Sequence, residues 1–139
     1  MIQNPMATIS YEGDLRTAAQ HIASGTVIHT DAPIDNKGKG QSFSPTDLLC
    51  VSWASCQLTI MGIKAEEAGL EVPSIKVKVY KTMANKPRRI GAIAMEIDMR
   101  GKYYSPEEKQ LLESAAHGCP VCRSLSPDIQ LKTHWIWAS

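Results

Sequence analysis

The stretch from Ser44 to Gly69, SPTDLLCVSWASCQLTIMGIKAEEAG, decides how the rest of the chain must be arranged. Ser44 offers a side-chain oxygen as N-cap, Pro45 suits the first helical turn, and Asp47 completes a capping-box pattern. The segment that follows is apolar on nearly every helical face from 48 to 63 and ends at Gly69. Because apolar faces must be covered, the pattern predicts a long buried helix that other elements surround.

The segments on either side of this helix read mostly as strands. Before it, residues 7–13, 16–24 and 26–30 predict an antiparallel meander, and the polar, glycine-rich residues 31–44 predict an irregular loop that could close over a pocket. After it, residues 74–83 and 93–100 alternate apolar and polar side chains, which is typical of strands with one wet face.

The last third of the chain adds a second helix and a final strand. Capping residues predict a helix from Ser105 to about Gly118, and Pro120 can start a further short helical piece. The closing strand is expected to place four apolar side chains on one face: Ile129, Leu131, Trp135 and Trp137. The order of elements predicts an α+β fold, and the absence of a repeat or linker predicts one domain over residues 1–139.

Charge and hydropathy exclude two classes of partner. The chain has 15 Lys and Arg against 14 Asp and Glu, so no positive field is expected to hold nucleic acid or an anionic membrane. The longest apolar stretch has 16 residues, whereas a bilayer span needs about 20. The start, MIQNPMATIS, lacks the pattern of a secretory signal. We therefore expect a cytoplasmic protein whose four cysteines are thiols and whose disulfides are transient.

The motif HGCPVCRSL, residues 117–125, leaves three uses open for its two cysteines. A thioredoxin-like motif should follow a strand, but here a predicted helix precedes Cys119 and only 17 residues follow Cys122. A zinc site needs four ligands, and the spacing of His117 and His134 matches no zinc pattern, so no metal site is predicted. The third use pairs Cys119 with the distant Cys56.

Family resemblance bears on that choice. The segments SPTDLLCVSWASC and CPVCRSL, together with GDLRT, SGTVIHTDAP and GKGQSFSPTDLL, resemble the OsmC/Ohr family (osmotically inducible protein C-like, organic hydroperoxide resistance-like) over nearly the whole chain. The resemblance implies an OsmC-like two-layer α+β fold with antiparallel sheets and a long central buried helix. It also implies an intertwined homodimer with active sites at the subunit interface, and no cofactor.

The resemblance implies a cysteine-dependent peroxidase acting on organic, and optionally inorganic, hydroperoxides. Cys56 would be the peroxidatic thiolate, Cys119 the resolving thiol and Arg16 the cation that a mid-helix thiolate needs. An external dithiol would regenerate both thiols: a lipoylated protein, thioredoxin or a small dithiol. Three apolar neighbours of Cys56 would either favour organic hydroperoxides or simply pack the core: Leu49, Trp53 and Ile60.

The sequence departs from the family pattern at two positions, Thr46 and Cys122. Thr46 stands where a characterised branch has the glutamate that pairs with the arginine, and Asp47 is rotated from that position by about 100° on a helix. We expect Asp47 to serve the helix cap, which leaves its support of Arg16 open. A small-molecule binding protein of the stress response, with little peroxidase activity, is therefore the alternative function. Cys122 is either a bystander or a local competitor for Cys119, and Cys50, about 240° from Cys56, is expected to be a small buried hydrophobe.

Overall fold

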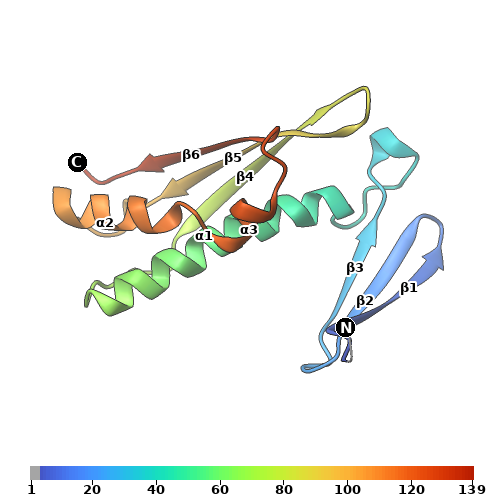
Figure 1. Ribbon diagram of the computed structural model, residues 1–139, viewed down its shortest axis with the longest axis horizontal. Coiled ribbons are helices and arrows are strands. Elements are labelled where there is room, and N and C mark those ends of the chain that lie inside the picture. Colours follow the sequence, from blue (N-terminus) through green and yellow to red (C-terminus); the bar gives the residue numbers. More distant parts are fainter. Residues whose placement is uncertain (1–3) are drawn as a thin grey trace. The chain divides into compact units, whose positions relative to one another are not determined.

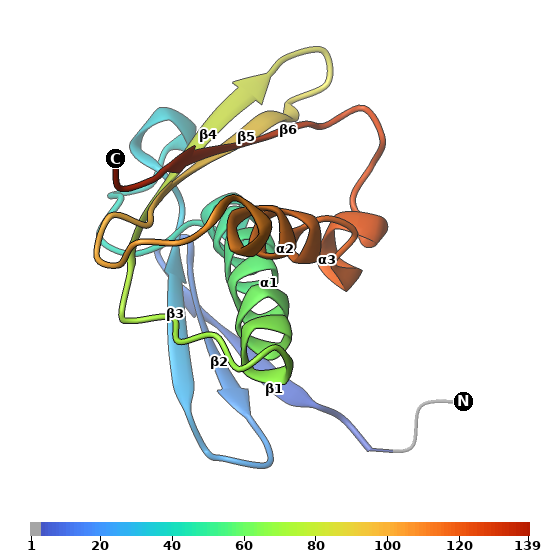
Figure 2. The same cartoon turned by 90° about the vertical axis from the view of Figure 1, so that its left-hand side faces the viewer.

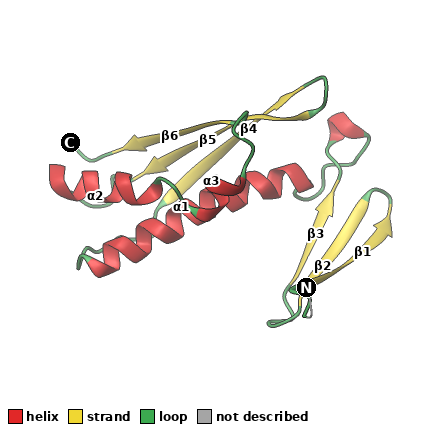
Figure 3. Cartoon of the chain, viewed as in Figure 1, coloured by secondary structure: helices red, strands yellow, loops and turns green. Residues whose placement is uncertain are grey.

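The computed structural model describes residues 4–139, whose elements are drawn in Figures 1 and 3. Contacts divide the chain into two compact units, Met1–Leu48 and Leu49–Ser139, and each contains its own three-stranded sheet. The arrangement is α+β with two sheets, as the sequence predicts. The expectation of a single domain over residues 1–139 stays a prediction.

The first unit is built on the predicted antiparallel meander. Its strands are β1 (Ala7–Gly13), β2 (Arg16–His21) and β3 (Val27–Asp31), paired in the order β1-β2-β3. The predicted irregular loop follows and contains one short 3-10 helix, η1 (Ile34–Asn36).

The loop after β3 folds back onto the end of that strand. The Gly40 N–H donates to the Ala32 carbonyl over 3.1 Å, and the Gly38 N–H donates to the Pro33 carbonyl over 2.9 Å. A Cβ atom on Gly38 would lie 1.8 Å from the Ala32 oxygen, so only glycine fits there. The fold-back brings the residues just after Gly40 next to the end of β3.

Helix α1 (Pro45–Glu67) has the cap that its sequence predicts. The Ser44 side chain accepts a hydrogen bond from the Asp47 N–H over 3.1 Å, and the Ser44 N–H donates to the Asp47 carboxylate over 2.9 Å. The reciprocal pair satisfies two backbone groups that a helix start leaves without partners. Asp47 therefore serves the cap, as expected.

Burial along α1 differs from the all-round burial that the sequence predicts. The buried side chains form one stripe at helical spacing: Cys50, Trp53, Ala54, Gln57, Met61 and Ala65. Leu49, Val51 and Ile63 are exposed instead, because the second unit covers only one face of the helix. By length and composition alone α1 could cross a bilayer, but its buried stripe belongs to the core of this unit.

The second unit packs its helices against one sheet. Strands β4 (Lys76–Ala84) and β5 (Arg89–Asp98) are antiparallel, and β6 (Gln130–Ile136) completes the order β4-β5-β6. Between β5 and β6 the chain passes through α2 (Pro106–Ala116) and α3 (Pro120–Ser124). Helices α1, α2 and α3 lie on the same side of this sheet (Figure 2).

The last strand corrects the expectation of purely antiparallel sheets, because β6 runs parallel to β5. The reason is the connection: the crossover through α2 and α3 returns the chain to the end of the sheet where β5 began, and a strand that starts there runs parallel. The predicted apolar face of this strand packs against the core, as expected: Ile129, Leu131, Trp135 and Trp137.

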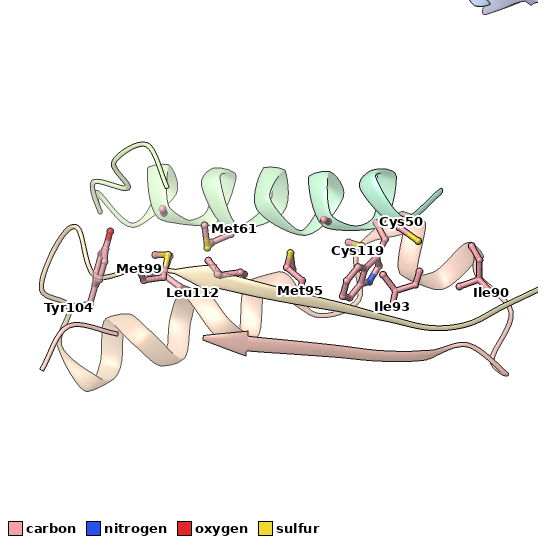
Figure 4. Packing of buried hydrophobic residues seen from close by; sticks show 13 residues of the cluster. Cys50, Met61, Ile90, Ile93, Met95, Met99, Tyr104, Leu112 and Cys119 are labelled. Carbon is pink, nitrogen blue, oxygen red and sulfur yellow. The ribbon is translucent and has the colours of Figure 1, made fainter. Parts of the chain in front are cut away.

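The core of the second unit lies between α1 and β5. Alternate residues of β5 are almost fully buried, with Ile93, Met95 and Ile97 at 1%, 1% and 0% exposure. Met61 of α1 and Met95 lie in the layer between these two elements (Figure 4). Cys119, at the start of α3, is part of the same buried cluster, so the core reaches the cysteine motif.

Candidate functional site

Three of the four cysteines meet in the second unit. Cys56 lies at mid-length in α1, Cys119 is the N-cap residue of α3, and Cys122 lies in the first turn of α3. Cys119 is buried at 1% exposure, while Cys56 and Cys122 are partly buried and pack against the same core. The fold thus brings the predicted pair Cys56 and Cys119 together and adds Cys122 to it.

Cys119 lies at the centre of this thiol cluster, which consists of Cys56, Cys119 and Cys122. Its Sγ accepts the Cys122 N–H over 3.3 Å and also interacts with the Cys56 side chain. Burial raises the pKa of the Cys119 thiol above its usual value. The hydrogen bond from the Cys122 backbone N–H lowers the pKa of Cys119. The interaction with the Cys56 side chain and the charges of the Cys56 and Cys122 thiolates raise it. Cys119 therefore holds its proton at neutral pH.

The remaining cysteine, Cys50, lies nearer the start of α1. Cys50 is buried at 2% exposure within the core stripe of α1, in agreement with its predicted role as a small hydrophobe. All four cysteines are thiols in this structure. Over the part of the chain that the structure describes, no group of three or more His, Cys, Asp or Glu side chains could hold a metal ion.

A second polar cluster lies in the first unit and contains Arg16. The register of β2 and β3 places Arg16 directly opposite Asp31, and the Arg16 Nε lies 3.6 Å from the Asp31 Oδ2. The folded-back loop adds Gln41, whose N–H donates to the same carboxylate oxygen over 2.9 Å and whose side-chain oxygen accepts from the guanidinium. Arg16 is therefore held by two partners on different segments.

Asp31 is the member of this cluster that sequence reasoning missed. Its side chain is 1% exposed, against 36% for Arg16, so the ion pair neutralises a carboxylate that burial would otherwise penalise. Its second oxygen, Oδ1, is buried and has no hydrogen-bond partner within residues 4–139. The signal in the sequence was weak, because it required the exact register of two strands.

The Arg16 cluster borders a pocket of about 400 Å³. The pocket is lined entirely by the first unit: Glu12, Arg16, Thr17, His29, Thr30, Asp31, Gln41 and Ser42. Neither Thr46 nor Asp47 is among these lining residues. Thr46 bonds the Ser44 hydroxyl over 3.1 Å, which places both residues in the cap of α1.

The three predicted substrate-pocket residues differ in exposure. Trp53 is 1% exposed and belongs to the core of the second unit, whereas Leu49 is 39% exposed and Ile60 is partly buried. The Trp53 indole N–H finds no acceptor among the described residues. Core packing therefore accounts for Trp53, and Leu49 is the most accessible of the three.

Comparison with known proteins places these features in a family. The model of the OsmC-like protein family matches residues 38–134. A solved structure from Psychrobacter arcticus, of a protein named for an osmotic stress and detoxification response, is 40% identical, covers 98% of each chain and has a TM-score of 0.93. No curated protein matches the chain.

More distant solved structures share the fold. The organic hydroperoxide resistance protein OsmC of Legionella pneumophila has a TM-score of 0.69 at 14% identity, covering 96% of this chain and 98% of its own. The organic hydroperoxide resistance protein OhrB of Bacillus subtilis has a TM-score of 0.68 at 17% identity, covering 94% and 97%.

Proposed function

The chain belongs to the OsmC-like protein family, and on that premise we propose that it is a thiol-dependent peroxidase that reduces organic hydroperoxides. One observation carries the proposal: Cys56 and Cys119, far apart in the sequence, interact within one buried cluster of the folded chain. Two thiols that interact in this way are candidates to form a disulfide with each other.

The proposed cycle uses the two thiols in turn. The Cys56 thiolate attacks the outer oxygen of the hydroperoxide, the O–O bond breaks, and the alcohol leaves after taking up a proton. Cys56 is then a sulfenic acid. The Cys119 sulfur attacks the Cys56 sulfur, water leaves, and a disulfide joins them. An external dithiol reduces this disulfide and is itself oxidised.

Burial supports this division of roles. Cys119 is 1% exposed and holds its proton, so it is poorly suited to meet a substrate from solution. Cys56 is partly exposed and therefore better placed to react first. The raised pKa of Cys119 suits a thiol that stays protonated until a sulfenic acid forms beside it.

We assign to Arg16 the stabilisation of the Cys56 thiolate, as the family resemblance implies. Asp31 and Gln41 orient the guanidinium, so the buried Asp31 supplies the carboxylate partner that Thr46 cannot. Asp47 is not needed for this role because it caps α1.

A homodimer is the assembly we propose. Four large apolar side chains of the first sheet are exposed in the single chain: Ile9 at 70%, Tyr11 at 67%, Ile28 at 49% and Val27 at 47%. Covering such side chains would stabilise the protein. Leu49, Val51 and Ile63 of α1 are exposed as well. A second copy with the same apolar surfaces is the simplest cover for them.

The test is turnover of cumene hydroperoxide by the purified chain with a small dithiol as reductant. We expect wild-type turnover, loss of at least about a hundredfold in Cys56→Ser because the nucleophile is removed, and a smaller loss in both Arg16→Met and Asp31→Asn. Cys50→Ala is the matched control and should keep wild-type activity.

Equal turnover by wild type and Cys56→Ser would refute the peroxidase. Retention of an apolar molecule in native mass spectrometry, with no peroxide consumed, would instead identify a binding protein. Full activity in both Arg16→Met and Asp31→Asn would remove the proposed role of that pair.

A further inference from the structure

We propose that Cys122 is a third redox-active cysteine. Its thiol displaces Cys56 from the Cys56–Cys119 disulfide, and the external dithiol then reduces the resulting Cys119–Cys122 disulfide. The inference deepens the proposed function and rests on it for the origin of the first disulfide. It replaces the expectation that Cys122 is a bystander.

The local geometry already brings Cys122 to Cys119. Cys119 is the N-cap of α3, and its sulfur accepts the backbone N–H of Cys122 over 3.3 Å. Residues three apart in a helical turn are neighbours, and Cys-x-x-Cys pairs placed in this way are an established form of redox-active dithiol. Pro120, the first residue of the helix, holds the turn in this shape.

Cys119 is consequently in contact with a cysteine on each side. Its sulfur interacts with Cys56 of α1 within the buried cluster and accepts a hydrogen bond from the backbone of Cys122 of α3. The central sulfur is also the least accessible of the three, because Cys119 is 1% exposed while Cys56 and Cys122 are partly buried. A thiol within the same chain reaches this sulfur more readily than a reductant from solution.

The proposed step is a thiol–disulfide exchange that balances within the chain. The Cys122 thiol loses its proton to solvent, and its sulfur attacks the Cys119 sulfur of the Cys56–Cys119 disulfide. The Cys119–Cys122 bond forms as the Cys56–Cys119 bond breaks, and Cys56 leaves as a thiolate. The number of disulfides does not change, so no further oxidant or reductant is needed for this step.

The exchange has two consequences for the cycle. Cys56 returns at once to the thiolate form that attacks the next hydroperoxide. The disulfide now closes a loop of only four residues, Cys119 to Cys122, and one of its two sulfurs belongs to the partly exposed Cys122. The dithiol then attacks the partly exposed Cys122 rather than a sulfur held on α1.

The test follows the disulfides over time. The reduced chain is treated with one equivalent of cumene hydroperoxide, quenched in acid at intervals, alkylated and mapped by mass spectrometry. Wild type and the control Cys50→Ala should form Cys56–Cys119 first and Cys119–Cys122 later. Cys122→Ser should stop at Cys56–Cys119, with an unchanged first turnover and dithiol-dependent recycling slower by about tenfold.

A parallel oxidation with diamide separates this inference from the peroxidase itself, because diamide oxidises thiols without needing peroxidase activity. A chain that consumes no hydroperoxide but with diamide forms Cys56–Cys119 first and Cys119–Cys122 later refutes the peroxidase and supports the exchange. A wild type that keeps Cys56–Cys119 under both oxidants, or a Cys122→Ser variant that recycles at the wild-type rate, overturns the exchange.

Discussion

At the scale of single residues, the proton on Cys119 links the fold to the chemistry. Burial raises the pKa of this thiol, so the folded chain binds the proton more tightly than the unfolded chain does. The stability that follows is fully present below the unfolded pKa of a cysteine, about 8.5. It is lost as the pH rises through the higher folded pKa, because the unfolded chain releases its proton first.

We therefore predict that the free energy of unfolding of the wild type falls more steeply between about pH 8 and pH 10 than that of Cys119→Ser. Urea denaturation of the reduced proteins at a fixed protomer concentration measures both slopes. Cys56 and Cys122 are present in both proteins, so the difference in slope isolates Cys119. Parallel curves would show that Cys119 titrates alike in the folded and unfolded chains.

At the scale of elements, the start of α1 depends on one buried side chain. Ser44 is 1% exposed and exchanges two hydrogen bonds with Asp47. Loss of the Ser44 hydroxyl would remove the bond that it accepts from the Asp47 N–H, which is one half of the capping box. A cap of this kind contributes about 1 kcal/mol to stability. The helix that it starts carries both the core stripe and Cys56.

Ser44→Ala should accordingly lower the free energy of unfolding by about 1 kcal/mol. Ser52→Ala, on an exposed position of the same helix, is the matched control and should change it by less than about 0.5 kcal/mol. Denaturant titrations of the three proteins give the comparison. Equal losses in both variants would mean that helix composition, rather than the cap, determines the effect.

At the scale of the whole molecule, exposed apolar side chains of both units form the surfaces that we propose the dimer covers. Ile9 and Tyr11 of the first sheet and Val51 of α1 are exposed in the single chain. Dimers that bury such surfaces often have no stable folded monomer.

Sedimentation over a dilution series should therefore find a species of twice the 15.2 kDa chain mass at micromolar concentration. Ile9→Lys, a substitution that a monomer would tolerate at an exposed position, should weaken that assembly. A folded 15 kDa monomer that persists in both proteins would rule the dimer out.

The sequence by itself determined the features that act over a few residues. The cap formed by Ser44 and Asp47, the alternation along β4 and the N-cap position of Cys119 were all predictable, because they depend on neighbours within one helical turn or one strand. Only the tertiary structure decided that β6 runs parallel to β5, that Asp31 is the carboxylate that holds Arg16, and that Cys119 lies against Cys56 of α1. The physical reason is that strand direction, cross-strand register and burial depend on segments far apart in the chain, which no local pattern of side chains specifies.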